Sequence, residues 1–441
     1  RCHDHKFDPV SQQDYFAMAG IFRSTRTMAN TNHVSRWVET VLEQPENASI
    51  IAAHEREIAE KKAEIGTLEK DETAEKRDER LKELKEQLKK LEAAGPALPK
   101  TMAVKEGEPV DLAVHLRGNH LTPAAEPTPR GVIRLFDDCL PSPVIGATNS
   151  GRLELADWLV DPRHPLTARV MVNRVWQGHF GSGLVRSPSN FGPRGEEPTH
   201  PELLDWLANE FVSGGWSVKA LHRTIMLSET YRRSSRSDAR AAELDPDNLL
   251  LWRQNRRRLE AEPIRDALLF VSGKLDRSGT YSLGDLEKNQ NYYKADQARF
   301  DKPTRAVYLP VVRAAGYEMF ATFDAADPAV HHQNRAATIV PSQALFMLNS
   351  ELALQAARDL AATVATGNAE DVKARIENLY LRLFARPPTA QETELLVRDL
   401  RSAAEPAAQT PALADWERLC RVLLAANEFV YVNRFINHLC N

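Results

Sequence analysis

One stretch of the sequence restricts the fold more than any other. Residues 55–92 carry 13 acidic and 11 basic side chains, with one glycine and no proline. Glu and Lys recur three and four residues apart, a spacing at which opposite charges stabilise a helix. Because charges of this density are almost never fully buried, the stretch predicts exposed helix outside any hydrophobic core.

The apolar residues in and around this stretch fall in two phases. The first set is Ile51, Ile58, Ile65 and Leu68, and the second is Leu81, Leu84, Leu88 and Leu91, with the polar run EKDETAEKRDER between them. We interpret residues 34–93 as a charged helical hairpin or coiled coil that turns in the polar run. One continuous helix with a phase shift is the alternative. Neither version carries chemistry, and such an arm typically spaces domains or binds a partner helix.

The whole chain predicts a mainly α fold, a multi-helix domain with this charged helical hairpin as an insertion and a small β-containing segment. Residues 1–33 form an opening segment, and residues 94–150, rich in Pro and Gly with short alternating apolar runs, predict strands and loops. Residues 151–441 form the expected α-helical domain. Helices are expected at 10–24, 152–160, 167–180, 201–213, 217–230, 263–275, 341–349, 351–366, 371–385, 389–402 and 414–430.

Two helix starts and two interruptions are specific enough to test. Ser11 with Asp14, and Thr389 with Glu392, have the spacing of N-terminal capping boxes. Residues 279–304 predict a polar loop, and RAVYLPVV at 305–312 predicts an edge strand or extended segment because of its interior proline.

The charge balance argues against nucleic acid as a partner. Lys and Arg total 57 against 61 for Asp and Glu, a formal net charge of -4, so the basic excess that binds phosphate backbones is missing. The arginine-rich RQNRRR at 253–258 has no interleaved aromatic residues for base stacking and indicates a local anion site or a salt-bridged face. The longest apolar stretches fall short of the ~18 residues of a membrane helix, so we predict no membrane span.

Cys2 and His3 give the sharpest chemical signal. In a C-x-x-C-H motif the cysteines bind haem through thioether bonds and the histidine ligates the iron. Arg1, Cys2 and His3 match its last three positions, so Cys2 and His3 are the predicted haem-binding residues and His3 the predicted metal ligand. One alternative is a reduced or disulfide-bonded cysteine beside a surface histidine. Another is a transition-metal site that includes Asp4 and His5.

A resemblance to known proteins supports the haem interpretation. RCHDHKFDPVSQQDYFAMAGIF resembles the end of the cytochrome-associated domain of large planctomycete secreted proteins. The run SGRLELADWLVDPRHPLTARVMVNRVWQGHFG, with RAVYLPVVR, TIVPSQALFMLNS, LYLRLFARPPTAQE and LCRVLLAANEFVYVN, resembles the planctomycete-specific domain of unknown function that follows it. The resemblance covers about residues 1–26 and 95–435 and leaves out the charged hairpin.

Several expectations follow from the resemblance alone. It implies haem c in the intact parent, with the first cysteine of the motif two positions before Arg1, so that a chain starting at Arg1 keeps at most one thioether. It also implies a periplasmic or secreted protein that transfers electrons, with polysaccharide metabolism as the coupled process. The implied partners are a redox partner or a polysaccharide-derived substrate.

A second polar cluster lies in the predicted helical domain. Its members are Asn173, Arg174, His179, Arg186, Asn190, Arg194 and His200, close to Gly-rich turns. Such side chains suit a sugar or carboxylate pocket, and capping of helices with pairing to nearby acidic residues is the simpler interpretation. The adjacent His331 and His332, and the isolated His115 and His120, show no recognisable ligand spacing.

Three functions therefore remain open. The first is electron transfer by a c-type-cytochrome-associated protein. The second is a non-catalytic scaffold module that binds glycans or proteins. The third is a metal-dependent hydrolase using His179, His200 or the adjacent histidine pair, although the sequence contains no G-x-S-x-G, H-E-x-x-H or P-loop pattern.

Overall fold

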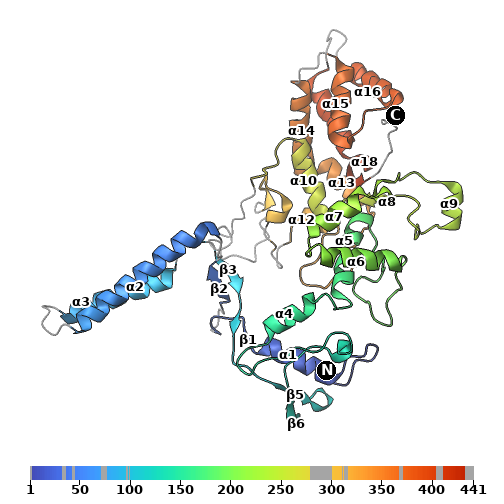
Figure 1. The fold of residues 1–441 in the computed structure, drawn as a ribbon. Helices are drawn as coiled ribbons and strands as arrows, with labels where there is room; N and C mark the ends of the chain where they lie inside the picture. Colours follow the sequence, from blue (N-terminus) through green and yellow to red (C-terminus); the bar gives the residue numbers. More distant parts are fainter. Residues whose placement is uncertain are drawn as a thin grey trace. The chain divides into compact units, whose positions relative to one another are not determined.

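The computed structural model describes residues 2–31, 36–41, 45–70, 77–95, 98, 100–278, 300–309, 311, 316–366, 371–403 and 411–432. It is mainly α-helical with a few short two-stranded sheets (Figure 1), so the predicted mainly α fold is confirmed. The chain divides into two compact units, an N-terminal unit of residues 1–167 and a C-terminal unit of residues 168–441. The division at residues 33, 93 and 150 stays a prediction.

Helix α1 (Gln12–Arg23) organises the core of the N-terminal unit. The Ser11 hydroxyl accepts a hydrogen bond from the Asp14 amide at 3.1 Å, and the Asp14 carboxylate accepts one from the Ser11 amide at 2.9 Å, which confirms the predicted capping box. Ile21 of α1 then packs with Val132, Leu140, Leu155 and Trp158. The last two belong to α4 (Arg152–Val160), so this small core joins the two helices.

The strands of the N-terminal unit pair two by two and antiparallel. β1 (Thr25–Arg26) pairs with β4 (Lys105–Glu106), β2 (Val38–Val41) with β3 (Lys100–Ala103), and β5 (Leu112–His115) with β6 (Pro123–Thr128). The short helices η1 (Pro45–Asn47), η2 (Leu116–Gly118) and η3 (Arg134–Phe136) complete it, with η2 connecting β5 to β6. The charged stretch forms α2 (Ala48–Lys70) and α3 (Arg77–Ala94), which contact each other.

In the C-terminal unit, α5 (Thr167–Phe180), α6 (Pro201–Ser213), α7 (Val218–Leu227) and α8 (Glu229–Arg232) surround one apolar core. The sequence predicts a single helix over 217–230, and this is wrong at one residue. The Ser228 hydroxyl accepts a hydrogen bond from the Tyr231 amide at 3.1 Å, so Ser228 ends α7 and caps α8.

A second core of the C-terminal unit is built around Leu268, Leu360, Ile376, Leu400 and Trp416. The helices that contribute to it are α10 (Ala261–Val271), α12 (Glu318–Thr322), α13 (Pro341–Asn349), α14 (Glu351–Ala365), α15 (Val372–Phe384), α16 (Ala390–Ala403), α17 (Leu413–Leu424) and α18 (Asn427–Val430). The short α9 (Ala239–Leu244) precedes them in the sequence and has no buried residue. The predicted capping box at Thr389 is confirmed by its two hydrogen bonds with Glu392. β7 (Arg257–Arg258) pairs with β8 (Tyr431–Val432).

The edge strand predicted at 305–312 is wrong at 306–308, where the chain forms the short helix η5 (Ala306–Tyr308). The reason is local, because the amides of Tyr308 and Leu309 donate back to the carbonyls of Arg305 and Ala306 at 2.9 and 3.0 Å. The Ala306 amide donates to the Asp266 carboxylate of α10 at 2.7 Å, so none of these amides bonds to a neighbouring strand. Of the loop predicted at 279–304, residues 279–299 lie outside the described residues.

Candidate functional site

The residues ahead of α1 form a compact turn fixed to the start of that helix. The Asp4 carboxylate accepts a hydrogen bond from the Gln12 amide at 2.8 Å, and the His5 amide donates to the Val10 carbonyl at 2.8 Å. His5 Nδ1 lies 3.0 Å from both the Asp8 amide nitrogen and a carboxylate oxygen of Asp8. This segment is therefore held in place by hydrogen bonds, although its side chains are mostly exposed.

His3 has the arrangement of a metal ligand that is oriented by its second nitrogen. Its Nδ1 lies 2.6 Å from the carbonyl oxygen of Asp4. A carbonyl can only accept, so Nδ1 carries the proton and the lone pair is on Nε2. Histidines that bind metals commonly donate their other ring N–H to a carbonyl in this way. The ring is exposed, which leaves Nε2 accessible to a large planar group.

Cys2 is a free, exposed thiol. Its sulfur lies against Gly118 at the end of η2, where a Cβ atom would come within 2.3 Å of Sγ. Only glycine permits this approach, and its φ of 76° is also one that other residues rarely adopt. The thiol and the His3 imidazole, adjacent in sequence and both exposed, fit the residue set that holds a c-type haem.

Asp4 and His5 have other roles in the turn. The Asp4 carboxylate caps α1, and His5 Nδ1 is occupied by Asp8. Across the part of the chain that the structure describes, no three His, Cys, Asp or Glu side chains form a group that could hold a metal ion. Asp4 and His5 are thus engaged in hydrogen bonds within the turn, and the haem-binding role of Cys2 and His3 stays a prediction.

The second predicted cluster is mainly structural at its centre. Asn173 is fully buried, and its amide bonds both backbone groups of Val185 at 2.9 Å, as a neighbouring strand would. Gly183 lies beside it, where a Cβ would come within 2.6 Å of the Asn173 amide. Asn190 accepts a hydrogen bond from the Gly192 amide at 3.1 Å and shapes a turn. Arg174, Arg186 and Arg194 are exposed.

The histidines of the C-terminal unit are distributed over separate places. His179 Nε2 lies 2.7 Å from Nδ1 of His222 on α7, a partner that the sequence analysis missed. No other metal-ligand residue stands at a recognisable helical spacing from His222 in the sequence. The pair of His179 and His222 therefore becomes visible only in the packing of α5 near α7. His200 instead contacts the Thr199 hydroxyl at 3.0 Å. His331 and His332 are exposed in a loop.

Two histidines of the N-terminal unit also differ in setting. His115 is half-buried, packs its ring edge-to-face on Phe16 at 4.9 Å, and has a buried Nδ1 without a hydrogen-bond partner among the described residues. His120 is exposed. Neither is grouped with other metal-ligand side chains within the described parts of the chain.

A search of the described residues for membrane spans identified no helix with the length and apolar character that crossing a bilayer requires.

Two protein-family models match separate parts of the chain. Residues 151–400, more than half of the chain, match the family model PSD1, a protein of unknown function (DUF1553). Residues 1–27, which include Cys2 and His3, match the family model PSCyt2, a protein of unknown function (DUF1549). No curated protein and no solved structure matches the chain.

Proposed function

Because the chain belongs to the PSD1 family of proteins of unknown function (DUF1553), which is cytochrome-associated, we propose its function from the site at its start. Cys2 would hold a c-type haem through a thioether bond, and His3 would ligate its iron. The protein is an electron-transfer component. The observation that supports the proposal is the hydrogen bond between His3 Nδ1 and the Asp4 carbonyl, which leaves the lone pair on the exposed Nε2.

Cys2 would supply the thiol of the thioether bond, and its addition to a haem vinyl group would need no oxidant because the sulfur and the proton would both end on that group. The exposed thiol is accessible for this addition. Gly118 supports the role because it lets the backbone approach Sγ closely and keeps the cysteine in one place.

A haem bound at this site supplies a one-electron couple, and the chain's own residues set how it is held. The Asp4 carbonyl fixes the orientation of the imidazole, and the Asp4 carboxylate ties that residue to α1. Because Cys2 and His3 are exposed, a redox partner has access to the site. We extend the proposal to a periplasmic or secreted location, where c-type haem is attached, and to polysaccharide metabolism as the coupled process.

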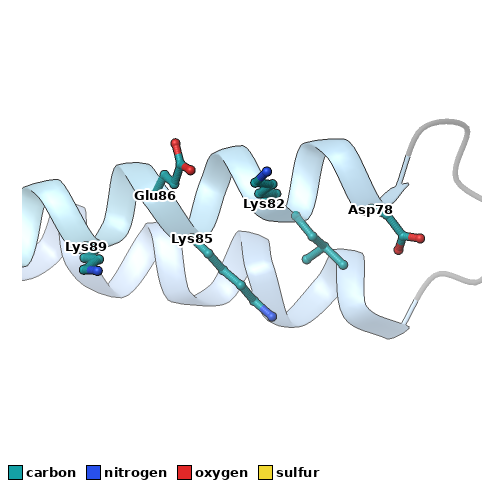
Figure 2. Close-up of a pocket in the computed structure, with 6 residues that line it drawn as sticks. Asp78, Lys82, Lys85, Glu86 and Lys89 are labelled. Carbon is teal, nitrogen blue, oxygen red and sulfur yellow. The ribbon is translucent and has the colours of Figure 1, made fainter.

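We also propose that α2 and α3 form an antiparallel hairpin of the coiled-coil type. Two ion pairs support it, Lys62 with Glu92 at 2.8 Å and Lys85 with Glu69 at 2.7 Å, because the residue numbers rise on one helix as they fall on the other. Figure 2 shows Lys85 reaching from α3 toward the neighbouring helix, while Lys82 and Glu86 point away from it. Lys82 and Glu86 belong to a shallow hollow that consists of α3 side chains alone and brings no catalytic groups together.

The test uses the complete reading frame of the gene, expressed with a cytochrome c maturation system. Denaturing electrophoresis with haem staining detects covalent attachment, and the pyridine haemochrome spectrum distinguishes one thioether from two. We expect a stained band, a shifted haemochrome band for Cys2→Ser, and loss of the low-spin spectrum for His3→Ala. His5→Ala is the matched control, because its exposed ring is two residues away and is expected to leave the spectrum unchanged. A full-length product without covalent haem, or equal effects of His3→Ala and His5→Ala, would refute the proposal.

A further inference from the structure

The C-terminal unit contains a cavity of about 1050 Å³ that the proposed haem site does not use. Its lining residues come from α10 and the residue before it, from parts of 300–309 with Val311, and from parts of 316–328, together with Leu275 and Arg335. Its size is at the upper end of the range for pockets that bind small organic molecules. The cavity lies within one compact unit, so its shape depends on that unit alone.

Aromatic rings form much of the apolar lining. Phe300 is almost fully buried and stacks on Tyr317 with ring centroids 4.7 Å apart and planes at 21°. Tyr317 meets Phe320 edge-to-face at 5.0 Å. Phe270 also lines the cavity and keeps 56% of its surface exposed. A buried aromatic stack with an exposed ring beside it offers π faces to a ligand with an apolar or cationic group.

The charged groups of the lining are mostly acidic. Four carboxylates, those of Glu260, Glu262, Asp266 and Asp327, lie near three guanidinium groups, those of Arg305 and Arg335 in the lining and of the buried Arg265, which is 3.6 Å from Asp266, so the formal excess is one negative charge. Arg335 pairs with both glutamates, at 3.0 and 2.7 Å, and Arg305 lies 3.8 Å from Asp266. Concave sites with one excess sign of charge concentrate ligands of the opposite sign.

One wall of the cavity is fixed by a buried polar cluster of Arg258, Asp324 and Thr338, called the clasp below. Asp324, directly before the lining residues 325–328, pairs with Arg258 at 2.6 Å, and both side chains are largely buried. The same carboxylate accepts hydrogen bonds from the amide and the hydroxyl of Thr338, each at 2.9 Å. These bonds join the two ends of the loop 325–337, which carries Arg335. This wall of the cavity is therefore formed in the ligand-free protein.

We propose that this cavity binds an organic cation, a molecule with an aromatic or aliphatic body and an ammonium or guanidinium group. The body packs on Phe270 and the Phe300–Tyr317 stack, and the positive charge is placed among the carboxylates on α10. Anions of the same size are repelled by the excess negative charge. This site is independent of the haem proposal, because none of its residues belongs to the N-terminal unit.

Isothermal titration calorimetry on the full chain tests the proposal, with benzyltrimethylammonium as the cation and phenylacetate as the anion of similar size. We expect the cation to bind at least tenfold more tightly than phenylacetate. Phe270→Ala should weaken cation binding by about 3- to 30-fold, the range for loss of a cation–π contact. Phe22→Ala is the matched control, because Phe22 is 60% exposed on α1 and does not line the cavity.

A charge variant gives an effect in the opposite direction. Arg305→Gln removes one positive group whose side chain is 57% exposed, so it should tighten cation binding several-fold without disturbing the core. Thermal melting checks that each variant is folded, and the wild-type comparison of cation with anion stands even where a variant unfolds. The proposal fails if phenylacetate binds as well as the cation, if neither binds at millimolar concentration, or if Arg305→Gln weakens the cation.

Discussion

Replacement of Asp324 by alanine should destabilise the part of the C-terminal unit around α12 and α13. Asp324 is paired with Arg258, and the exposed fractions of the two side chains are only 14% and 6%. Arg258 retains bonds to the carbonyls of Phe323 and Thr338 in the variant, yet among the described residues its charge loses the only carboxylate within ion-pair distance. The buried positive charge is then uncompensated.

The magnitude follows from this burial. Removing one partner of a buried ion pair costs about 3–5 kcal/mol. Asp324 also has a φ of 59°, in the left-handed region that aspartate and asparagine tolerate better than alanine. Asp324→Asn keeps an acceptor for Thr338 and tolerates this φ, so its smaller loss isolates the effect of the charge, about 1.5–3 kcal/mol.

Hydrogen-exchange mass spectrometry of peptides that cover residues 318–349 gives a local measurement. A loss of 3–5 kcal/mol corresponds to about 100- to 4000-fold faster exchange in this region. Asp399→Ala is the control, since Asp399 forms a 3.0 Å pair with Arg418 in which both side chains are about half exposed, and such pairs contribute about 0–1 kcal/mol.

The pH dependence provides an independent check. Burial alone would raise the pKa of Asp324, but the hydrogen bonds from Arg258 and Thr338 outweigh it and hold this pKa below its ordinary value of 3.8. The carboxylate therefore contributes stability above pH 3.8 that is lost as the pH falls through the lower, folded-state pKa. Equal exchange rates in wild type and Asp324→Ala at neutral pH, or a difference that grows on acidification, would refute the reasoning.

Three further outcomes are expected. Asn173→Ala should lower the melting temperature, because each of the two buried backbone groups that it bonds costs about 1–3 kcal/mol when unpaired. Burial raises the pKa of the Cys420 thiol to about 12, so a disulfide reagent at pH 8 should label the exposed Cys139 in the native protein and reach Cys420 only in denaturant. The hydrogen bonds from Arg386 lower the pKa of Glu392 from 4.5 to about 2, so the destabilisation measured for Glu392→Gln by urea unfolding should be full above pH 4.5 and disappear toward pH 2.

Local features of the fold were predictable because their causes are close in sequence. The capping boxes at Ser11 and Thr389 each depend on two residues three positions apart, and both form. The helix from Pro201 to Ser213 has its proline at the first turn and glycines after its end, and its observed bounds equal the predicted ones. Periodicity and capping together therefore give most of the helices.

Features that depend on distant residues could not be predicted in this way. The clasp joins Arg258 to Asp324, which are 66 positions apart, so the arginine-rich run at 253–258 indicated a salt-bridged face but not Asp324 as the partner. The strand expected at 305–312 failed for the same reason, since the Ala306 amide bonds to the Asp266 side chain of α10, 40 positions before it. The haem prediction depends only on the adjacent Cys2 and His3, and it stays a prediction.

The position of Cys2 has a practical consequence for anyone who purifies this protein. Cys2 is an exposed thiol next to Gly118, so oxidants and other thiols in the solvent can react with it. Chains whose sulfur has not been alkylated will pair through mixed disulfides during storage in air. Non-reducing gels will then show dimers that disappear when a reductant is added. Molecules in which the Cys2 sulfur is alkylated cannot form such dimers through Cys2.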